Sequence, residues 1–334
     1  MRAPTSSQHV RACFWLVAAT VLWGVSFPLT KAILAKQQLM LPGSPTPFFA
    51  ALLAVVRFGI AGIVVILVAA RSLRQLTGCE IRQGLGLAFF GGIGILLQID
   101  GLAYTSASVS AFLTQFYCLL IPIWVICRTR ALPTFAVVVS SILVLAGAAI
   151  LADVRWGDFR VGRGEAETLL AAMFFAGQIL WLERPEFAAN RTSHFTLVMF
   201  FGTSLLATPI ALYYAPSLKV WVTAYSDISL LILLLGLVVF CTLGSYGLMN
   251  AWQKHITATE AGLIYCVEPV AAFGFALFLP QWLSVLAAIN YPNERITSNL
   301  LIGGSFILAA NVLIQIEAAR RARRVFRSIE SQRV

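Results

Sequence analysis

Long runs of apolar residues, separated by short polar segments, occupy almost the whole of the 334-residue chain. A helix that crosses a bilayer needs about 20 predominantly apolar residues, and its backbone groups must be hydrogen-bonded within the structure. The runs are apolar on every face rather than in alternation, which favours helices over membrane strands. Ten spans are predicted, near residues 12–34, 47–70, 82–103, 106–127, 132–152, 164–183, 195–214, 229–252, 258–280 and 297–317.

The composition leaves little of the chain outside a membrane. Hydrophobic residues make up 59% and charged residues 11%, whereas a typical soluble domain has about 25% charged residues. The mean hydropathy is +0.85. No polar segment is long enough to form a soluble catalytic domain. We therefore expect an all-α membrane protein whose activity takes place within or across the bilayer.

Lysine and arginine are unevenly distributed over the predicted loops. If the N-terminus is inside, the inner segments hold 16 of the 24 and the outer loops hold 7, with Arg57 inside a span. Positive residues concentrate in the cytoplasmic loops of membrane proteins. Both termini are therefore predicted to face the cytoplasm, in the cell (inner) membrane. The basic tail, residues 318–334, directly follows a span, which favours contact with anionic lipid over binding of nucleic acid.

The two halves of the chain are related by an offset of 151 residues. Five spans per half is an odd number, so the second half enters the membrane from the opposite side. Such inverted repeats are typical of secondary transporters, with the substrate site near the midplane where the repeats meet. The predicted units are residues 12–152 and 164–317. The aligned positions are Tyr104–Ser108 with His255–Thr259, Thr114 with Tyr265, Tyr117 with Glu268 and, within one residue of the same offset, Trp23–Ser26 with Phe175–Gln178.

Short motifs also follow one another in a set order along residues 12–318. They are Trp23-Gly24-x-Ser26-Phe27, Arg57-Phe58, Tyr104-Thr105-Ser106-Ala107, Glu268-Pro269 and Glu294-Arg295-Ile296-Thr297. In this order and spacing the chain resembles the EamA-like family of the drug/metabolite transporter superfamily. The resemblance implies two inverted five-helix repeats and the export or exchange of small metabolites such as amino acids.

The chain departs from this family pattern in two places. The first half has Cys118 where a proline is expected, and Pro122 follows one turn later. The segment 280–293 is about ten residues longer than the pattern, and we expect an interfacial helix around 281–289. This segment is interpreted either as an outer lid or as a longer loop.

Charged residues inside predicted spans are the strongest candidates for function. A charge at mid-bilayer costs about 2.5–3.5 kcal/mol and should face the interior of the bundle with a partner. Arg57 and Glu268 lie near the middle of the second and ninth spans. Glu268 is interpreted either as a protonatable group that couples transport to a proton gradient, or as a structural group that pairs with Arg57 or compensates for Pro269. Asp100 is expected to be a vestibule charge near Lys31, or a solvated helix end.

Polar and aromatic residues follow single faces of several predicted spans. In the fourth span, Ser110 and Thr114 are separated by four residues, which places them on one helical stripe. The alternative is that each hydroxyl bonds to its own backbone and that each aromatic ring only fills space. The predicted substrate pathway consists of Trp23, Ser26, Phe27, Gln98, Ser110, Thr114, Gln115, Tyr117, Gln178, Tyr246, Asn250 and Tyr265.

Prolines within the spans are predicted hinges, because a proline frees a carbonyl and lets a helix bend. The proposed hinge positions are Pro28, Pro122 and Pro269. Static membrane helices contain proline as well, so the position alone does not establish movement.

These features together predict a secondary transporter, an exporter or exchanger of small organic metabolites, driven by a proton gradient or by exchange. The alternative within the same class is an uncoupled facilitator. An intramembrane enzyme is disfavoured, because the chain has three histidines and neither an H-E-x-x-H nor a G-x-S-x-G motif. A scaffold subunit would not need inward polar stripes. The expected partners are a small-molecule solute and the lipid bilayer, and no cofactor or metal is predicted.

Overall fold

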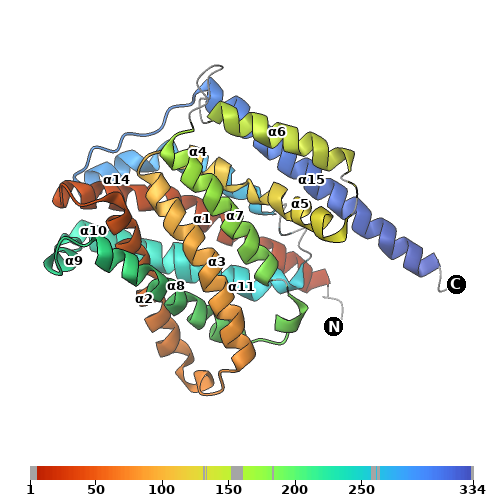
Figure 1. Cartoon of the computed structure of the whole chain (residues 1–334), viewed down its shortest axis with the longest axis horizontal. Helices are drawn as coiled ribbons and strands as arrows, with labels where there is room; N and C mark the ends of the chain where they lie inside the picture. The colour runs from red at the N-terminus through yellow and green to blue at the C-terminus, as the bar shows by residue number, and fades with distance from the viewer. Residues whose placement is uncertain are drawn as a thin grey trace.

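The computed structural model describes residues 6–331 except 131, 133, 152–160, 183, 257–260 and 262–263. The chain is 84% helical, and the described residues contain no β-strand. Figure 1 shows the helices gathered into one bundle, with α6 and α15 side by side along one edge. The elements are α1 (Ser6–Met40), α2 (Thr46–Leu73), α3 (Gly78–Leu102), α4 (Ala107–Thr114), α5 (Tyr117–Thr129), α6 (Phe135–Leu151), α7 (Arg163–Leu182), the 3₁₀ turn η1 (Pro185–Phe187), α8 (Thr192–Tyr214), α9 (Lys219–Thr223), α10 (Ile228–Val238), the π-helical segment η2 (Val239–Gly244), α11 (Ser245–Trp252), the 3₁₀ turn η3 (Gln253–His255), α13 (Val267–Ala276), α14 (Leu279–Ala287) and α15 (Ser298–Ser331).

Among the described residues, six helices are long and apolar enough to cross a membrane, and a seventh span results if the bent pair α13–α14 counts as one. The six are α1, α2, α3, α7, α8 and the continuous segment from α10 to η3. Shorter apolar helices, Ala107–Ile121, Phe135–Leu151 and Ser298–Leu313, fall at the predicted fourth, fifth and tenth spans. The chain is therefore a multi-pass membrane protein, while the number of ten crossings stays a prediction.

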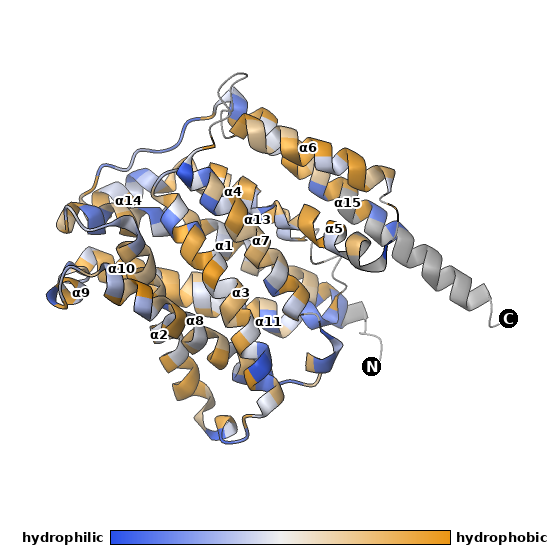
Figure 2. Cartoon of the chain, in the orientation of Figure 1, coloured by the Kyte–Doolittle hydropathy of each residue, from blue (hydrophilic) through white to orange (hydrophobic). Residues whose placement is uncertain are grey.

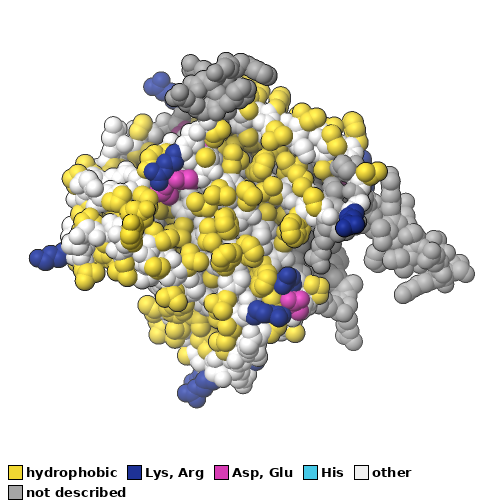
Figure 3. Space-filling model, viewed as in Figure 1, with side chains coloured by type: hydrophobic (Ala, Val, Ile, Leu, Met, Phe, Trp, Pro, Cys, Tyr) yellow, Lys and Arg dark blue, Asp and Glu magenta, His cyan; other side chains and the backbone are white. Residues whose placement is uncertain are grey.

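The surface of the bundle is apolar, as contact with lipid requires. Leu67, Val68, Leu205 and Leu235 are among the many large hydrophobic side chains that are exposed. Hydrophobic residues cover the helices in Figure 2, and charged side chains form only small groups on the face seen in Figure 3. Soluble monomers rarely expose continuous apolar surface of this extent. The surface thus supports the membrane location independently of helix length.

Some of the elements differ from the predicted spans. The predicted fourth span, 106–127, is divided into α4 and α5, and the predicted eighth, 229–252, contains the π-helical segment η2. The predicted tenth span continues as α15 to Ser331, so most of the tail 318–334 is helical rather than a separate segment. The longer segment after residue 280 does contain a helix, α14, which is bent by 55° relative to α13.

The helix breaks in the two halves occur at positions related by the sequence offset. Between α4 and α5 the chain turns at Gln115–Phe116, where Cys118 N donates to Gln115 O at 2.9 Å and Leu119 N to Phe116 O at 3.0 Å. These bonds span three residues and tighten the helix locally. In the second half, Cys266 occupies a turn directly before α13. Gln115 and Cys266 differ by the same 151 positions that align the sequences.

The most extensive helix contacts join the two halves. α2 packs against α8, and α6 packs against α15. These are the second with the seventh and the fifth with the tenth predicted spans. α3 packs as extensively against α7 and α8, which also belong to the other half.

Two of these contacts depend on glycine. A Cβ added to Gly101 of α3 would lie 2.9 Å from the carbonyl oxygen of Gly164 in α7, and one added to Gly164 would lie 2.7 Å from Gly101 O. Gly147 of α6 and Gly303 of α15 exclude each other's Cβ in the same way, at 2.7 and 2.9 Å. Small residues let membrane helices approach this closely, and van der Waals packing then holds them together.

We expect Gly101→Ala to lower the thermal stability of the purified protein. The new methyl group meets backbone, which cannot move aside as a side chain could, so α3 and α7 must separate. Gly236→Ala is the control, because no atom lies within 4 Å of a Cβ added there. Alanine is about 1 kcal/mol better than glycine inside a helix, so the control should be neutral or stabilising. Equal melting temperatures for the two variants would contradict the close packing.

Candidate functional site

A cavity with about 640 Å³ of empty space, part of it open to solvent, lies between helices of both halves. Eight of the twelve predicted pathway residues line it, together with Arg57 and Glu268. The lining residues are Trp23, Ser26, Arg57, Ile95, Gln98, Thr114, Tyr117, Phe175, Gln178, Ile179, Leu182, Tyr246, Met249, Tyr265 and Glu268. A mixed lining of this kind, largely apolar with a few polar groups, is typical of small-molecule sites.

Twelve of the fifteen lining residues form six pairs related by the internal offset. An offset of 151 or 152 residues relates the two members of each pair. The pairs are Trp23 with Phe175, Ser26 with Gln178, Ile95 with Tyr246, Gln98 with Met249, Thr114 with Tyr265, and Tyr117 with Glu268. Equivalent positions of both halves therefore face the same space, although the residue types within a pair mostly differ.

Aromatic rings form one wall of the cavity. The Trp23 ring lies 5.5 Å from that of Tyr246 and 5.8 Å from that of Tyr265, both in edge-to-face geometry. The indole nitrogen of Trp23 is buried and has no hydrogen-bond partner within the described part of the chain. Buried polar groups are nearly always satisfied by protein, water or ligand. This N–H is thus available to a molecule in the cavity.

Arg57 is 2% exposed and is held by the π-helical segment η2. Its Nε donates to Thr242 Oγ1 at 2.6 Å, and its Nη2 donates to Cys241 O at 3.0 Å. Both acceptors are neutral. No carboxylate of the described residues lies within ion-pair distance of the guanidinium. The hypothesis that Arg57 and Glu268 are direct partners is therefore wrong, because each is bound by other groups of its own neighbourhood.

Glu268 is 8% exposed and stands in the first turn of α13. Its Oε2 accepts from Gln115 Nε2 at 3.2 Å, and Gln115 Oε1 accepts from Cys118 Sγ at 3.7 Å. Gln115 occupies the turn between α4 and α5. Gln115, at the helix break of the first half, thus donates to Glu268, which lies directly after the helix break of the second half.

The four remaining predicted pathway residues do not line the cavity. Phe27 is 2% exposed and belongs to the hydrophobic core. Ser110 bonds to Thr168, and Asn250 donates to Thr196 Oγ1 at 2.9 Å. Gln115 lies behind Glu268, as described above. Helical spacing placed Ser110 and Asn250 on the faces of the lining residues Thr114 and Tyr246, but depth along the helix decides which residues reach the cavity.

Asp100 does not pair with Lys31. Its Oδ2 accepts from Arg163 Nη2, while Lys31 Nζ donates to Thr105 O. The Arg163 guanidinium also lies over the Tyr104 ring at 4.4 Å. Arg163 is the first residue of α7, and the packing of α7 on α3 brings it to the end of α3. The interpretation of Asp100 as a charge near Lys31 is therefore corrected.

Two of the three predicted hinges lie away from the helix breaks, and the third, Pro269, lies just after one. Pro28 lies inside the continuous helix α1, and Pro122 lies within α5. Pro269 is in the first turn of α13, where a missing N–H costs little. A hinge role for these prolines stays a prediction.

Five apolar lining residues were not identified from the sequence. Ile95, Phe175, Ile179, Leu182 and Met249 have no polar group that marks them. The internal offset could have identified three of them. Phe175, Ile95 and Met249 are the repeat equivalents of the predicted pathway residues Trp23, Tyr246 and Gln98. Ile179 and Leu182 extend the cavity along α7.

Polar contacts lie beyond one end of the cavity, all but one of them between the halves, and we refer to them as the closing layer. They join the end of α3 and the start of α4 to α1, α7 and the segment before α15. Glu294 caps α4 across the interface with its carboxylate. The contacts are Lys31 Nζ to Thr105 O, Thr105 Oγ1 to Glu165 Oε1 at 2.6 Å, Ala107 N and Ser108 N to Glu294 Oε1 at 2.8 and 3.4 Å, and Ser110 Oγ with Thr168 Oγ1 at 3.2 Å.

The closing layer separates the cavity from this end of the bundle. Along α7, Thr168 comes two turns before the lining residue Phe175, and along α4, Ser110 comes one turn before Thr114. In the other direction the lining reaches Leu182, the last residue of α7. The cavity therefore extends from the closing layer toward the opposite end of α7.

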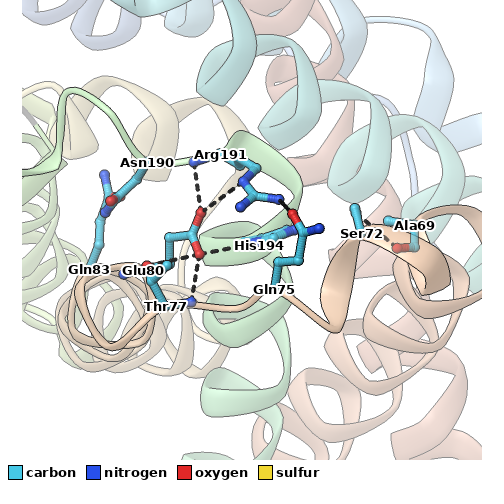
Figure 4. A network of polar contacts seen from close by, with 9 residues as sticks. All are labelled: Ala69, Ser72, Gln75, Thr77, Glu80, Gln83, Asn190, Arg191 and His194. Carbon is cyan, nitrogen blue, oxygen red and sulfur yellow. Dashed lines mark hydrogen bonds and ion pairs between the residues drawn. The ribbon is translucent and has the colours of Figure 1, made fainter.

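A second polar cluster, which we name the Glu80 clamp, joins the loop between α2 and α3 to the loop before α8 (Figure 4). Thr77 and Glu80 form a capping box at the start of α3. The same carboxylate accepts from Arg191 N at 3.0 Å and lies 2.9 Å from His194 Nδ1. Both Glu80 and His194 are buried. His194 is not among the candidate residues that the sequence indicated.

Glu80→Gln is expected to lower the melting temperature of the protein by several degrees. Glutamine has one oxygen where glutamate has two, so it cannot accept all of these hydrogen bonds. The buried His194 or the Arg191 N–H then loses its partner, which is costly away from water. Glu186→Gln is the control, since Glu186 is 44% exposed and makes surface ion pairs, which contribute little. The two melting temperatures, measured in the same detergent, check this, and a larger loss in the control would contradict it.

Comparisons with known proteins agree with a membrane transporter. No family model matches the chain. An uncharacterized transporter from Archaeoglobus fulgidus is 24% identical over 302 residues, which cover 89% of this chain and 85% of that protein. A crystal structure of a protein superposes with a TM-score of 0.58 and 17% identity over 93% of this chain and 98% of that chain, which shows the fold alone. Similarity to a transporter over most of the length supports this broad class.

Proposed function

We propose that the chain is a secondary transporter, an exporter or exchanger of small organic metabolites such as amino acids across the cell (inner) membrane. The single observation that supports this best is the cavity, which is lined by six pairs of repeat-related residues and in which Arg57 and Glu268 do not pair with each other. A static scaffold gains nothing from two buried charges of opposite sign held apart. A solute that carries complementary groups can bind to both of these side chains.

The proposed architecture consists of two inverted EamA-like repeats, residues 12–152 and 164–317, with both termini in the cytoplasm. The common offset of sequence, helix breaks and cavity lining supports the repeats. The start of α1 and the end of α15 lie toward the same end of the bundle in Figure 1, which is consistent with an even number of crossings. In this orientation the closing layer is on the outer side, and the cavity opens toward the cytoplasm.

The proposed transport cycle alternates between this inward-open form and an outward-open form. A solute enters from the cytoplasmic side and is bound between the aromatic wall, Arg57 and Glu268. The closing layer then separates while the cytoplasmic side closes, in line with the rocking of repeats around a fixed central site. Net export requires an energy source, and we assign Glu268 as the group that exchanges a proton for solute.

An uncoupled facilitator is the competing function. It would use the same cavity, and Glu268 would only bind solute. Proton movement during solute flux distinguishes the two, because a coupled transporter acidifies or alkalinises the vesicle interior in proportion to the solute that it moves.

The test is transport by the purified protein in liposomes loaded with a mixture of the proteinogenic amino acids. Efflux of each compound is measured by mass spectrometry, with and without an imposed pH gradient, and vesicles without protein give the leak. We expect one chemical group of solutes to leave faster than the leak and to respond to the gradient. Efflux equal to the leak for amino acids, and for a wider extract of cellular metabolites, would reject a transporter function.

A further inference from the structure

The π-helical segment η2 interrupts what would otherwise be a regular helix from α10 to α11. Such segments are rare in proteins and are frequent at functional sites. Here Thr242 Oγ1 donates to Leu237 O at 3.0 Å, five residues earlier, and Ser245 Oγ donates to Cys241 O at 2.6 Å. The hydroxyl groups of Thr242 and of Ser245, the residue directly after η2, thus donate to carbonyl oxygens in and just before the widened turn.

Two residues of η2, Thr242 and Cys241, bind Arg57. Thr242 Oγ1 accepts a hydrogen bond from Arg57 Nε and donates one to Leu237 O, while Cys241 O accepts from both Arg57 Nη2 and Ser245 Oγ. The guanidinium is therefore fixed along its Nε–Nη2 edge by a hydroxyl and a carbonyl. Its orientation depends on the π-helical turn, because that turn presents both acceptors on the side of α2.

The other edge of the guanidinium is left for a ligand. Nη1 has no acceptor among the described residues, and Nη2 has a second hydrogen, so one Nη1–Nη2 edge remains. Two parallel N–H groups in this geometry match the two oxygens of a carboxylate. Arg57 lines the cavity and is 2% exposed. A buried cation without an anion is unfavourable, and an anionic group in the cavity would remove that cost.

We propose that η2 makes Arg57 a carboxylate-binding site, with Thr242 as the positioning residue, so that the transported solutes carry a carboxylate. This rests on the proposed function and narrows its substrate class. Glu268, on the opposite half, is the partner for a cationic group of the same solute. The site then selects molecules with a carboxylate and an ammonium group over their amides or esters.

The test compares Thr242→Val, Thr242→Ser and Thr208→Val in liposomes. Valine keeps the volume of threonine but removes its hydroxyl, and serine keeps the hydroxyl. Thr208 is the matched control, because its hydroxyl also bonds a carbonyl of its own membrane helix, Ser204 O at 2.8 Å, and it does not line the cavity. The probes are a mixture of the proteinogenic amino acids and a matching mixture of their amides, in which a neutral carboxamide replaces the α-carboxylate.

We expect the wild-type protein to move the acids in preference to the amides. Thr242→Val should raise the KM for the best-transported acid about tenfold, the loss expected when a charged donor loses its hydrogen-bond partner. The KM for its amide should not change. Thr242→Ser should restore the wild-type KM, and Thr208→Val should equal the wild type. Melting temperatures show whether each variant is folded.

Two outcomes would overturn the inference while leaving the transporter function intact. One is equal transport of acids and amides by the wild-type protein, or transport of other metabolites only. The other is a Thr242→Val variant, folded and active, whose KM for acid and amide change by the same factor. No transport of any solute by the folded wild-type protein would instead reject the proposed function itself.

Discussion

Replacing Glu268 with glutamine is expected to abolish solute flux driven by a proton gradient, while the protein stays folded and in the membrane. Glutamine keeps the volume of the side chain and an acceptor for Gln115 Nε2, which lies 3.2 Å from the carboxylate. It cannot bind or release a proton. Because the proton-binding group is proposed to be the coupling site, loss of titration removes the driving force and leaves the cavity in place.

The measurement is flux in liposomes with and without a pH gradient, combined with exchange of labelled against unlabelled solute at equal pH. Glu268→Gln should lose the response to the gradient, and exchange should continue at saturating solute, because exchange needs no net proton movement even where the loss of the carboxylate weakens solute binding. Glu186→Gln serves as the matched control on the surface, where Glu186 pairs with Arg82 at 3.1 Å. A variant that still follows the pH gradient would show that Glu268 is structural and would favour the facilitator.

A disulfide across the closing layer is expected to stop transport completely and reversibly. Ser110 Oγ and Thr168 Oγ1 lie 3.2 Å apart and come from α4 and α7, one from each half. Both oxygens are attached directly to Cβ, so cysteines at these positions come within the range of a disulfide. If the halves must separate here for the outward-open form, a bond at this point locks the protein in the inward-open form.

The experiment uses Ser110→Cys with Thr168→Cys, in a background where the six native cysteines, which form no disulfide among the described residues, are replaced by alanine. Flux is measured after oxidation and again after reduction, and each single-cysteine variant is treated in the same way. We expect loss of flux only in the oxidised double variant and full recovery on reduction. Unchanged flux in a fully cross-linked sample would show that the closing layer does not move during transport.

Asp227 is a charged group outside the cavity whose role needs no movement of protons. Asp227, before α10, accepts hydrogen bonds from the Ser229 hydroxyl and pairs with Lys36 at 2.9 Å. The Ser229 hydrogen bond, followed by that of Lys36, lowers the pKa of Asp227 to about 2. Asp227 is thus ionised at all physiological pH values. Such a group can anchor α10 to α1, and it cannot serve as the coupling site.

Much of the cavity could be predicted because it follows local rules. Charged residues in an apolar span must face the interior, which identified Arg57 and Glu268, and helical spacing placed Thr114 and Tyr117 on the inner face. The internal offset relates the two halves from the amino-acid sequence alone. It also indicates the apolar lining residues Ile95 and Met249, which are the equivalents of Tyr246 and Gln98.

The partners of these residues could not be predicted. Arg57 binds Thr242 and Cys241, which are about 185 positions away, because a π-helical turn presents two acceptors there. Nothing in the local sequence of η2 distinguishes it from a regular membrane helix. Asp100 likewise binds Arg163 because α7 packs on α3. Such pairings depend on how helices meet, and hydrophobic periodicity contains no information on this.

The amino-acid sequence alone determined the membrane location, the helical class and the candidate charges, because transfer of apolar and charged groups into lipid depends on composition and on spacing along one helix. The tertiary structure decided which charges remain without a counter-ion, where the helices break and which end of the cavity is closed. These properties arise from distances between helices far apart in the chain, where glycine contacts such as Gly101 with Gly164 set the approach.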